Sequence, residues 1–289
     1  MIRILATVVI IAMVGVIAVY VYAQHLRRSS MFFPLKYPEG SWDTSSLPVK
    51  PEEQWITTPD GVRLNAWLFR AREANAPLLV YFHGNAGNIG ERGPVASKLA
   101  AHGVSVLLFD WRGYGKSEGT PTEEALFIDA LAAYDSVWAP ASAGTARAEA
   151  RDHIERPNIS VYGESLGGPY AAYVAKQRGA KSVVIESSFP SLSELGDTLY
   201  APIPLGWTAR HSLTAARWLN QAGAPVLVMH GKPDAVIPFK MGSSLYDQLR
   251  VPKEMLVSET AAHCEIANAE GERYYETVTR FVTSHSKPN

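Results

Sequence analysis

The chain has 289 residues, with 27 basic against 28 acidic side chains and a hydrophobic fraction of 47%. This length is enough for one large core, and the balanced charge argues against a protein that binds nucleic acid. Cys264 is the single cysteine, so the chain can form neither an intramolecular disulfide nor a cysteine-rich zinc site. We therefore expect one globular domain whose stability comes from the packing of its core.

The chain begins with a strongly apolar segment. Residues 4–23 are all apolar, small or aromatic except Thr7. About 20 residues at a rise of about 1.5 Å each match the hydrocarbon core of a bilayer, whereas the apolar core of a signal peptide is usually about 7–15 residues long. We predict an uncleaved transmembrane anchor, with a cleaved signal peptide or a buried core helix as alternatives. Arg27 and Arg28 after the span outnumber Arg3 before it, a bias too small to decide which side of the membrane carries the domain.

The remaining chain divides into a short connecting segment and a catalytic domain. We assign residues 1–25 to the anchor, residues 26–50 to a juxtamembrane segment and residues 51–289 to the domain. The juxtamembrane segment contains the apolar, proline-broken stretch 31–35. That stretch predicts either a wedge against lipid or packing on the core.

Along the domain, patterns typical of strands and helices alternate. Residues 54–58 and 63–69 are rich in β-formers and flank the turn at 59–61, which predicts an antiparallel hairpin. Apolar runs typical of strands buried on both faces follow at 78–82, 104–109, 159–162, 182–185, 226–229 and 255–257. Helical patterns lie at 92–101, 122–137, 166–178, 240–250 and 271–283. This order predicts an α/β fold with a mostly parallel, doubly wound sheet.

Two other stretches interrupt this alternation. Residues 140–156 are rich in alanine and charged side chains, which predicts an exposed insertion. Residues 189–217 contain prolines and few apolar periods, which predicts a small lid.

The pattern Gly-x-Ser-x-Gly occurs twice, around Ser165 and around Ser117. A reactive serine in this motif needs a strand directly before it and a helix directly after it. Ser165 has both, and Pro169 is tolerated in the first turn of the helix. Ser117 lies in a glycine-rich loop that continues to Pro121, so a helix cannot start directly after this serine. We predict that Ser165 is the nucleophile and that Ser117 is part of the loop structure.

A serine hydroxyl needs an imidazole to take its proton and a carboxylate to orient that imidazole. In α/β enzymes of this kind the chain order is serine, acid, histidine. Asp234 lies in the loop after the run 226–229, and His263 lies in the loop after the run 255–257. Because the carboxyl ends of parallel strands meet at one edge of the sheet, we predict the triad Ser165, Asp234 and His263, with Glu186 as the alternative acid.

The oxyanion formed during acyl transfer needs backbone N–H donors. The residue after the nucleophile, Leu166, supplies one. The second is expected from the glycine-rich loop after the run 78–82, where Asn85 is the candidate donor and His83 supports the loop.

Together these motifs resemble the α/β-hydrolase superfamily. The resemblance is carried by the His83-Gly84-Asn85 loop, the stretch 110–117, the motif 163–167 and the His230-Gly231 step that leads to Asp234. Within the superfamily the chain is similar to membrane-anchored, short-lid serine hydrolases of the esterase or serine aminopeptidase-like type. The resemblance implies hydrolysis of an acyl bond through an acyl-enzyme, without a metal or an organic cofactor.

The sequence thus predicts a serine esterase or lipase-like enzyme. Its expected partners are the bilayer, through the N-terminal helix, and an acyl ester or thioester substrate that enters from the membrane surface. That substrate is a small molecule, a lipid or a lipidated protein. A peptidase that releases N-terminal residues is the first alternative, although no acidic pocket for a free amine is visible. An inactive membrane-tethered binding protein is the second.

Overall fold

The central element of the fold is an eight-stranded sheet with the order β10-β9-β8-β7-β4-β6-β3-β2. It belongs to a computed structural model that describes residues 2–138, 158–202, 205–209 and 211–286, so the predicted insertion at 140–156 lies outside the described residues. The strands are β2 (Glu52–Thr57), β3 (Arg63–Phe69), β4 (Leu78–Phe82), β6 (Ser105–Phe109), β7 (Ile159–Glu164), β8 (Val183–Glu186), β9 (Val226–Gly231) and β10 (Lys253–Ser258). β3 is antiparallel to β2 and β6, and the other pairs are parallel. The predicted α/β fold with its hairpin is confirmed.

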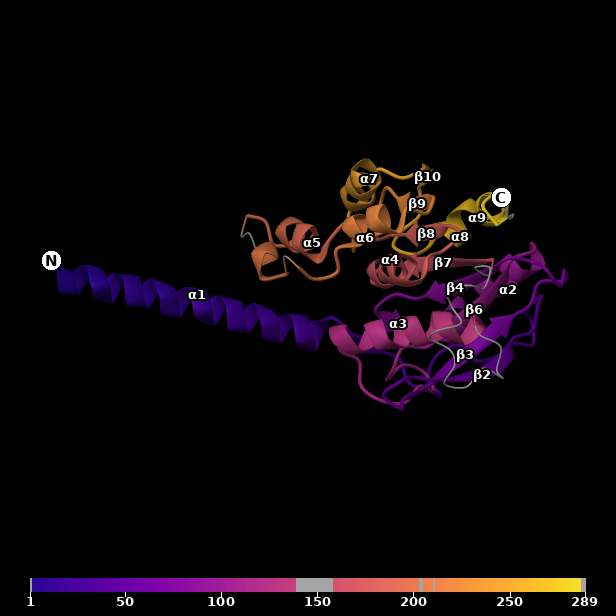
Figure 1. The fold of residues 1–289 in the computed structure, drawn as a ribbon, viewed down its shortest axis with the longest axis horizontal. Coiled ribbons are helices and arrows are strands. Elements are labelled where there is room, and N and C mark those ends of the chain that lie inside the picture. The colour runs from indigo at the N-terminus through magenta and orange to yellow at the C-terminus, as the bar shows by residue number, and fades with distance from the viewer. Residues whose placement is uncertain (1, 139–157, 203–204, 210, 287–289) are drawn as a thin grey trace.

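The sheet is buried on both faces. In β4, Val80 and Phe82 belong to one core cluster, and Leu79 and Tyr81 belong to the other. The first face is covered by α3 (Glu123–Trp138), α4 (Gly167–Arg178), α6 (Ala215–Ala222) and α7 (Phe239–Gln248) (Figure 1). The second is covered by α2 (Ile89–Ala101), α8 (Ile266–Glu270) and α9 (Glu272–Ser284). Burial on both sides is the reason that these strands read as continuous apolar runs.

The predicted lid region consists of α5 (Leu192–Leu199) and the short 3₁₀ helix η3 (Leu205–Ala209). The following helix, α6, starts inside the predicted lid range but buries Ala215, Ala216 and Leu219 in the core. The last residues of that range therefore belong to the body of the domain.

The N-terminal helix α1 (Ile2–Ser30) projects away from the domain (Figure 1). Its stretch Arg3–Tyr22 has a mean hydropathy of 2.9, and none of it is buried. It is long and apolar enough to cross a membrane, and its exposure rules out the alternative of a buried core helix.

Directly after α1 comes a segment of the domain that we call the strap, residues 31–37. Met31 and Phe32 pack against the first core cluster. The two-residue strand β1 (Phe33–Pro34) pairs in parallel with β5 (Ala86–Gly87), outside the main sheet. Residues 26–30 of the predicted juxtamembrane segment therefore belong to α1, and Met31 and Phe32 pack on the core, while the Phe33 side chain remains about half exposed.

A buried acidic group lies at the end of β8. Glu186 is 3% exposed, and its carboxylate accepts a hydrogen bond from the Tyr162 hydroxyl. The Tyr274 hydroxyl lies 3.5 Å from the same carboxylate oxygen. Burial raises the pKa of Glu186 to about 7.

The raised pKa of Glu186 predicts a pH-dependent stability. The unfolded chain loses this proton near the ordinary pKa of 4.5, whereas the folded chain keeps it up to about 7. Between these values the folded state binds more protons, so the stabilisation is present below about 4.5 and is lost as the pH rises through about 7. One pKa unit is worth about 1.4 kcal/mol, so the full effect is on the order of a few kcal/mol.

Glu186→Gln removes this titration. Urea unfolding in detergent at about pH 5 and about pH 8 should therefore show the variant gaining stability relative to wild type as the pH rises. A difference between the two proteins that stays constant across this range would contradict the expectation.

Candidate active site

Ser165 occupies a tight turn between β7 and α4, with a positive φ of 51°. The neighbouring backbone segments approach so closely that side chains do not fit. A β-carbon on Gly163 would lie 2.5 Å from the α-carbon of Gly168, and one on Gly167 would lie 2.0 Å from the carbonyl oxygen of Phe82. The glycines of the motif are thus required by packing, and the turn lifts the serine above the end of the strand.

The three residues predicted as a triad come together at one edge of the sheet. The Ser165 Oγ lies 3.0 Å from His263 Nε2, although the residues are 98 positions apart. His263 Nδ1 lies 2.8 Å from Asp234 Oδ2. Asp234 follows β9 and His263 follows β10, which are adjacent parallel strands. Because a carboxylate only accepts, His263 Nδ1 donates to Asp234 and leaves Nε2 to accept the serine proton.

The environment of Asp234 favours its charged form. Its Oδ1 accepts hydrogen bonds from the N–H groups of Val236 and Ile237, both at 2.9 Å. Burial by itself would raise the pKa of Asp234. The hydrogen bonds from His230 and His263 outweigh this effect and hold the pKa well below its usual range. Asp234 is therefore ionised at neutral pH and can stabilise a charged imidazole.

His230 is a supporting residue to which the sequence analysis gave no role. Its Nε2 donates to the carbonyl oxygen of Ile237 at 2.8 Å and lies 3.3 Å from Asp234 Oδ2. The ring packs so tightly on α7 that a β-carbon on Gly242 would lie 2.3 Å from His230 Nδ1. His230 thus holds the loop that carries Asp234. The available signal was a histidine at a strand end, four residues before an acid.

The two alternatives from the sequence are engaged elsewhere. Glu186 contacts tyrosine hydroxyls, whereas the carboxylate in contact with His263 is that of Asp234. The Ser117 hydroxyl accepts from the Asn65 N–H and donates to the Asp110 carbonyl oxygen, both at 2.8 Å. Ser117 therefore braces its loop.

The loop after β4 is fixed at successive peptide groups. The Gly84 N–H donates to Glu164 Oε1 at 3.3 Å, and the Gly84 carbonyl accepts from His83 Nδ1 at 2.8 Å. The Asn85 carbonyl accepts from the Tyr114 hydroxyl at 2.7 Å. Since the Gly84 carbonyl and the Asn85 N–H belong to one peptide unit, the His83 bond also orients that N–H.

This loop lies beside the predicted nucleophile. A β-carbon on Gly84 would be 3.4 Å from the β-carbon of Ser165. Within the described ranges, the N–H groups of Asn85 and Leu166 donate to no protein acceptor. Two such donors next to a serine can receive an oxyanion.

The carboxylate that binds the Gly84 N–H belongs to a buried ion pair. Arg92 Nη2 lies 2.8 Å from Glu164 Oε1, and the Tyr81 hydroxyl donates to Glu164 Oε2 at 2.7 Å. Burial alone would raise the pKa of Glu164, but Arg92 and Tyr81 hold it at about 2. The carboxylate that accepts the Gly84 N–H is therefore ionised. The sequence analysis missed this pair, because its members are 72 positions apart.

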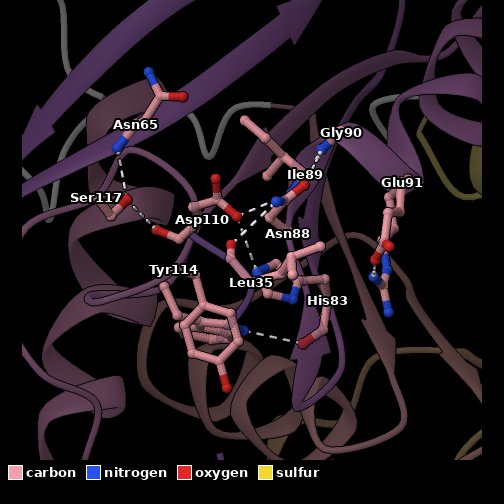
Figure 2. A network of polar contacts seen from close by, with 12 residues as sticks. Leu35, Asn65, His83, Asn88, Ile89, Gly90, Glu91, Asp110, Tyr114 and Ser117 are labelled. Carbon is pink, nitrogen blue, oxygen red and sulfur yellow. Dashed lines mark hydrogen bonds and ion pairs between the residues drawn. The ribbon is translucent and has the colours of Figure 1, made fainter. Parts of the chain in front are cut away.

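Figure 2 shows the other side of the loop, where His83 faces Asp110. His83 Nε2 lies 3.6 Å from Asp110 Oδ1, and both side chains are fully buried. Asp110 Oδ1 also accepts the Ile89 N–H at 2.9 Å, at the start of α2. Burial raises the pKa of Asp110. His83 and Asp110 thus support the loop rather than line its reactive side.

No group of histidine, cysteine, aspartate or glutamate side chains that could hold a metal ion occurs in the part of the chain that the structure describes. Cys264, next to His263, is partly buried, and the desolvation of its thiol raises the pKa well above the ordinary value. A raised pKa keeps a thiol in its less reactive, protonated form.

Comparison with known proteins identifies the family. Residues 77–204 match a family model described as the alpha/beta hydrolase fold. An uncharacterized protein of Mycobacterium tuberculosis is 32% identical over 284 residues, which cover 97% of this chain and 95% of the relative. The lysophosphatidylserine lipase ABHD12 of Danio rerio is 28% identical over 253 residues, covering 76% of this chain and 63% of that protein.

A solved structure agrees with this assignment. An esterase from Pyrococcus furiosus superposes with a TM-score of 0.68 at 20% identity, covering 89% of this chain and 99% of that one, which is a likeness of fold. The resemblance predicted from the motifs is confirmed, and the chain belongs to the α/β-hydrolase family.

Proposed function

We propose that the protein is a membrane-anchored serine hydrolase that cleaves a lipophilic acyl ester or thioester. The observation that carries the proposal is the hydrogen-bonded chain from Ser165 through His263 to Asp234. This arrangement converts a weakly nucleophilic hydroxyl into one that can attack an acyl carbon at neutral pH.

In the first half of the proposed reaction, the Ser165 Oγ attacks the carbonyl carbon while His263 Nε2 takes the hydroxyl proton. The π electrons of the carbonyl move onto its oxygen, and the N–H groups of Asn85 and Leu166 stabilise the negative charge. The bond to the leaving alcohol or thiol then breaks, and His263 donates its proton to that group. The product is an acyl-Ser165 ester.

The second half repeats these steps with water. His263 takes a proton from water, the hydroxide adds to the acyl carbon, and the Ser165 oxygen leaves and recovers the proton. Ionised Asp234 stabilises the charged imidazole in both halves.

The region around the lid supports a lipophilic substrate and an uncleaved α1. The rings of Tyr20 in α1 and Trp207 in η3 lie with centroids 5.5 Å apart. Leu199 and Tyr200 at the end of α5 are about half exposed. If α1 spans the bilayer, these side chains lie near its interface, where aromatic rings are favoured. The printed name of the Danio rerio relative, a lysophosphatidylserine lipase, also fits a lipid substrate.

The nucleophile is tested by labelling with a fluorophosphonate probe. We expect Ser165→Ala to abolish labelling, because the activated serine oxygen bonds to the probe phosphorus as the P–F bond breaks and fluoride leaves. Ser117→Ala is the matched control, since it removes the serine of the second motif, and it should be labelled like wild type. Equal labelling of wild type and Ser165→Ala would contradict the proposal that Ser165 is the nucleophile.

The choice of acid is tested with a pair of amide variants. Asp234→Asn should lower kcat by about 10⁴-fold with little change in KM, because the amide no longer favours the required imidazole tautomer. Glu186→Gln, in the alternative acid, should keep kcat within a few-fold of wild type. Steady-state kinetics with a p-nitrophenyl ester measures both, and the reverse ranking would assign the role to Glu186.

The substrate class is tested by comparing hydrolysis rates. We expect p-nitrophenyl esters with long acyl chains, and a lysophospholipid in vesicles, to react faster than short-chain esters and aminoacyl anilides. Ser165→Ala controls for background hydrolysis. Faster cleavage of the anilides would favour the aminopeptidase-like alternative.

A further inference from the structure

We infer that the strap, residues 31–37, is a positioning element of the proposed oxyanion hole. The segment that joins the membrane helix to the domain would then set the rate of catalysis as well as the location of the enzyme. This inference rests on the proposed function, because the loop has a catalytic role only if Ser165 forms an oxyanion.

Backbone hydrogen bonds tie the strap to the loop that carries Asn85. The Phe33 N–H donates to the Asn85 carbonyl oxygen at 2.8 Å, and the Leu35 N–H donates to the Gly87 carbonyl oxygen at 3.1 Å. The short strand β5 belongs to a two-stranded sheet whose other strand is β1. The strap is therefore the strand partner of the loop.

Side chains of the loop also donate hydrogen bonds to backbone carbonyls of the strap and of Glu39. Asn85 Nδ2 donates to the Met31 carbonyl oxygen at 3.1 Å. Asn88 Nδ2 donates to the carbonyl oxygens of Leu35 and Glu39, both at 3.0 Å, and Figure 2 shows Asn88 beside Leu35. The hydrogen bonds thus run in both directions between the strap and the loop.

The strap is itself held on its other side. The Gly115 N–H donates to the Leu35 carbonyl oxygen, and the Tyr37 N–H donates to the Gly115 carbonyl oxygen, both at 3.0 Å. The strap therefore bridges the loop around Gly115 and the loop that carries Asn85. It also follows α1 without a linker, since α1 ends at Ser30 and the Met31 carbonyl already accepts a hydrogen bond from Asn85.

The Asn85 N–H and the Asn85 carbonyl lie in adjacent peptide units joined at the Asn85 α-carbon, so holding the carbonyl in place restrains the N–H. That carbonyl accepts from Phe33 in the strap and from the Tyr114 hydroxyl. Losing the Phe33 bond leaves this carbonyl with the Tyr114 hydroxyl as its donor, and a displacement of about 1 Å in an active site can cost about 10²-fold in rate. The effect should fall on the step that develops negative charge, which means on kcat rather than on KM.

Two variants of the full-length protein remove different strap bonds. Phe33→Pro deletes the N–H that donates to Asn85, at a half-exposed position of an extended segment. Asn88→Ser keeps a side-chain oxygen to cap the Gly90 N–H at the start of α2, but it removes the donors to Leu35 and Glu39. Asn88→Ser keeps the test available if Phe33→Pro does not fold.

The matched control is Lys36→Pro. Within the described ranges the Lys36 N–H makes no hydrogen bond, so this change introduces the same ring into the strap without removing a strap bond. Its kcat should stay within about two-fold of wild type.

The measurement combines ester kinetics with inhibition by a trifluoromethyl ketone. The Ser165 oxygen bonds to the ketone carbon, its proton goes to His263, and the ketone oxygen becomes an oxyanion that needs the same N–H donors. We expect Phe33→Pro to lower kcat by about 10- to 100-fold at nearly constant KM and to weaken ketone inhibition in parallel. Asn88→Ser should change both in the same direction.

The outcomes separate this inference from the proposed function. If wild type hydrolyses esters and folded Phe33→Pro and Asn88→Ser match it in kcat and ketone affinity, the strap has no positioning role. An equal loss in Lys36→Pro would also overturn the inference, because no strap bond is removed there. If wild type itself neither hydrolyses an acyl substrate nor reacts with the fluorophosphonate, the proposed function fails first.

Discussion

The arrangement of the site depends on the close contact between the start of α4 and the end of β4. Gly167 lies so near the Phe82 carbonyl that no β-carbon fits, and this contact fixes the turn in which Ser165 adopts a positive φ. A hydroxyl raised above the sheet in this way can be reached only from loops at the same edge. Asp234 and His263 occupy such loops after β9 and β10.

Two buried glutamates near this turn differ in pKa, and the difference follows from their partners. Glu164 faces the Arg92 guanidinium, which together with Tyr81 keeps its pKa at about 2 despite burial. Glu186 faces tyrosine hydroxyls, and burial raises its pKa to about 7. The ionised Glu164 can hold the Gly84 N–H, so the loop beside Ser165 is positioned by a charge that never contacts the reacting atoms.

The same loop connects the site to the N-terminal helix. It is held from inside the domain by Glu164 and His83 and from outside by the strap. Most hydrolytic sites are built on a rigid scaffold with loops at its edge. In this protein the segment leaving the apolar helix is one of the supports of such a loop, so the position of the helix and the geometry of the site are physically linked.

The sequence by itself determined the features that have a local signature. Apolar runs predicted the strands, because burial on both faces excludes polar alternation, and the strand and helix around Ser165 distinguished it from Ser117. The strand ends also pointed to Asp234 and His263. Only the tertiary structure decided the supports of the site: the pairing of Arg92 with Glu164, the contact of His230 with the Asp234 loop, and the strap on Asn85. Arg92 and Glu164 are distant in the chain, and the strap pairs through backbone groups that every residue type carries, so no residue pattern could reveal these two contacts. His230 lies four positions before Asp234, but only the folded loop shows that its ring holds the Ile237 carbonyl.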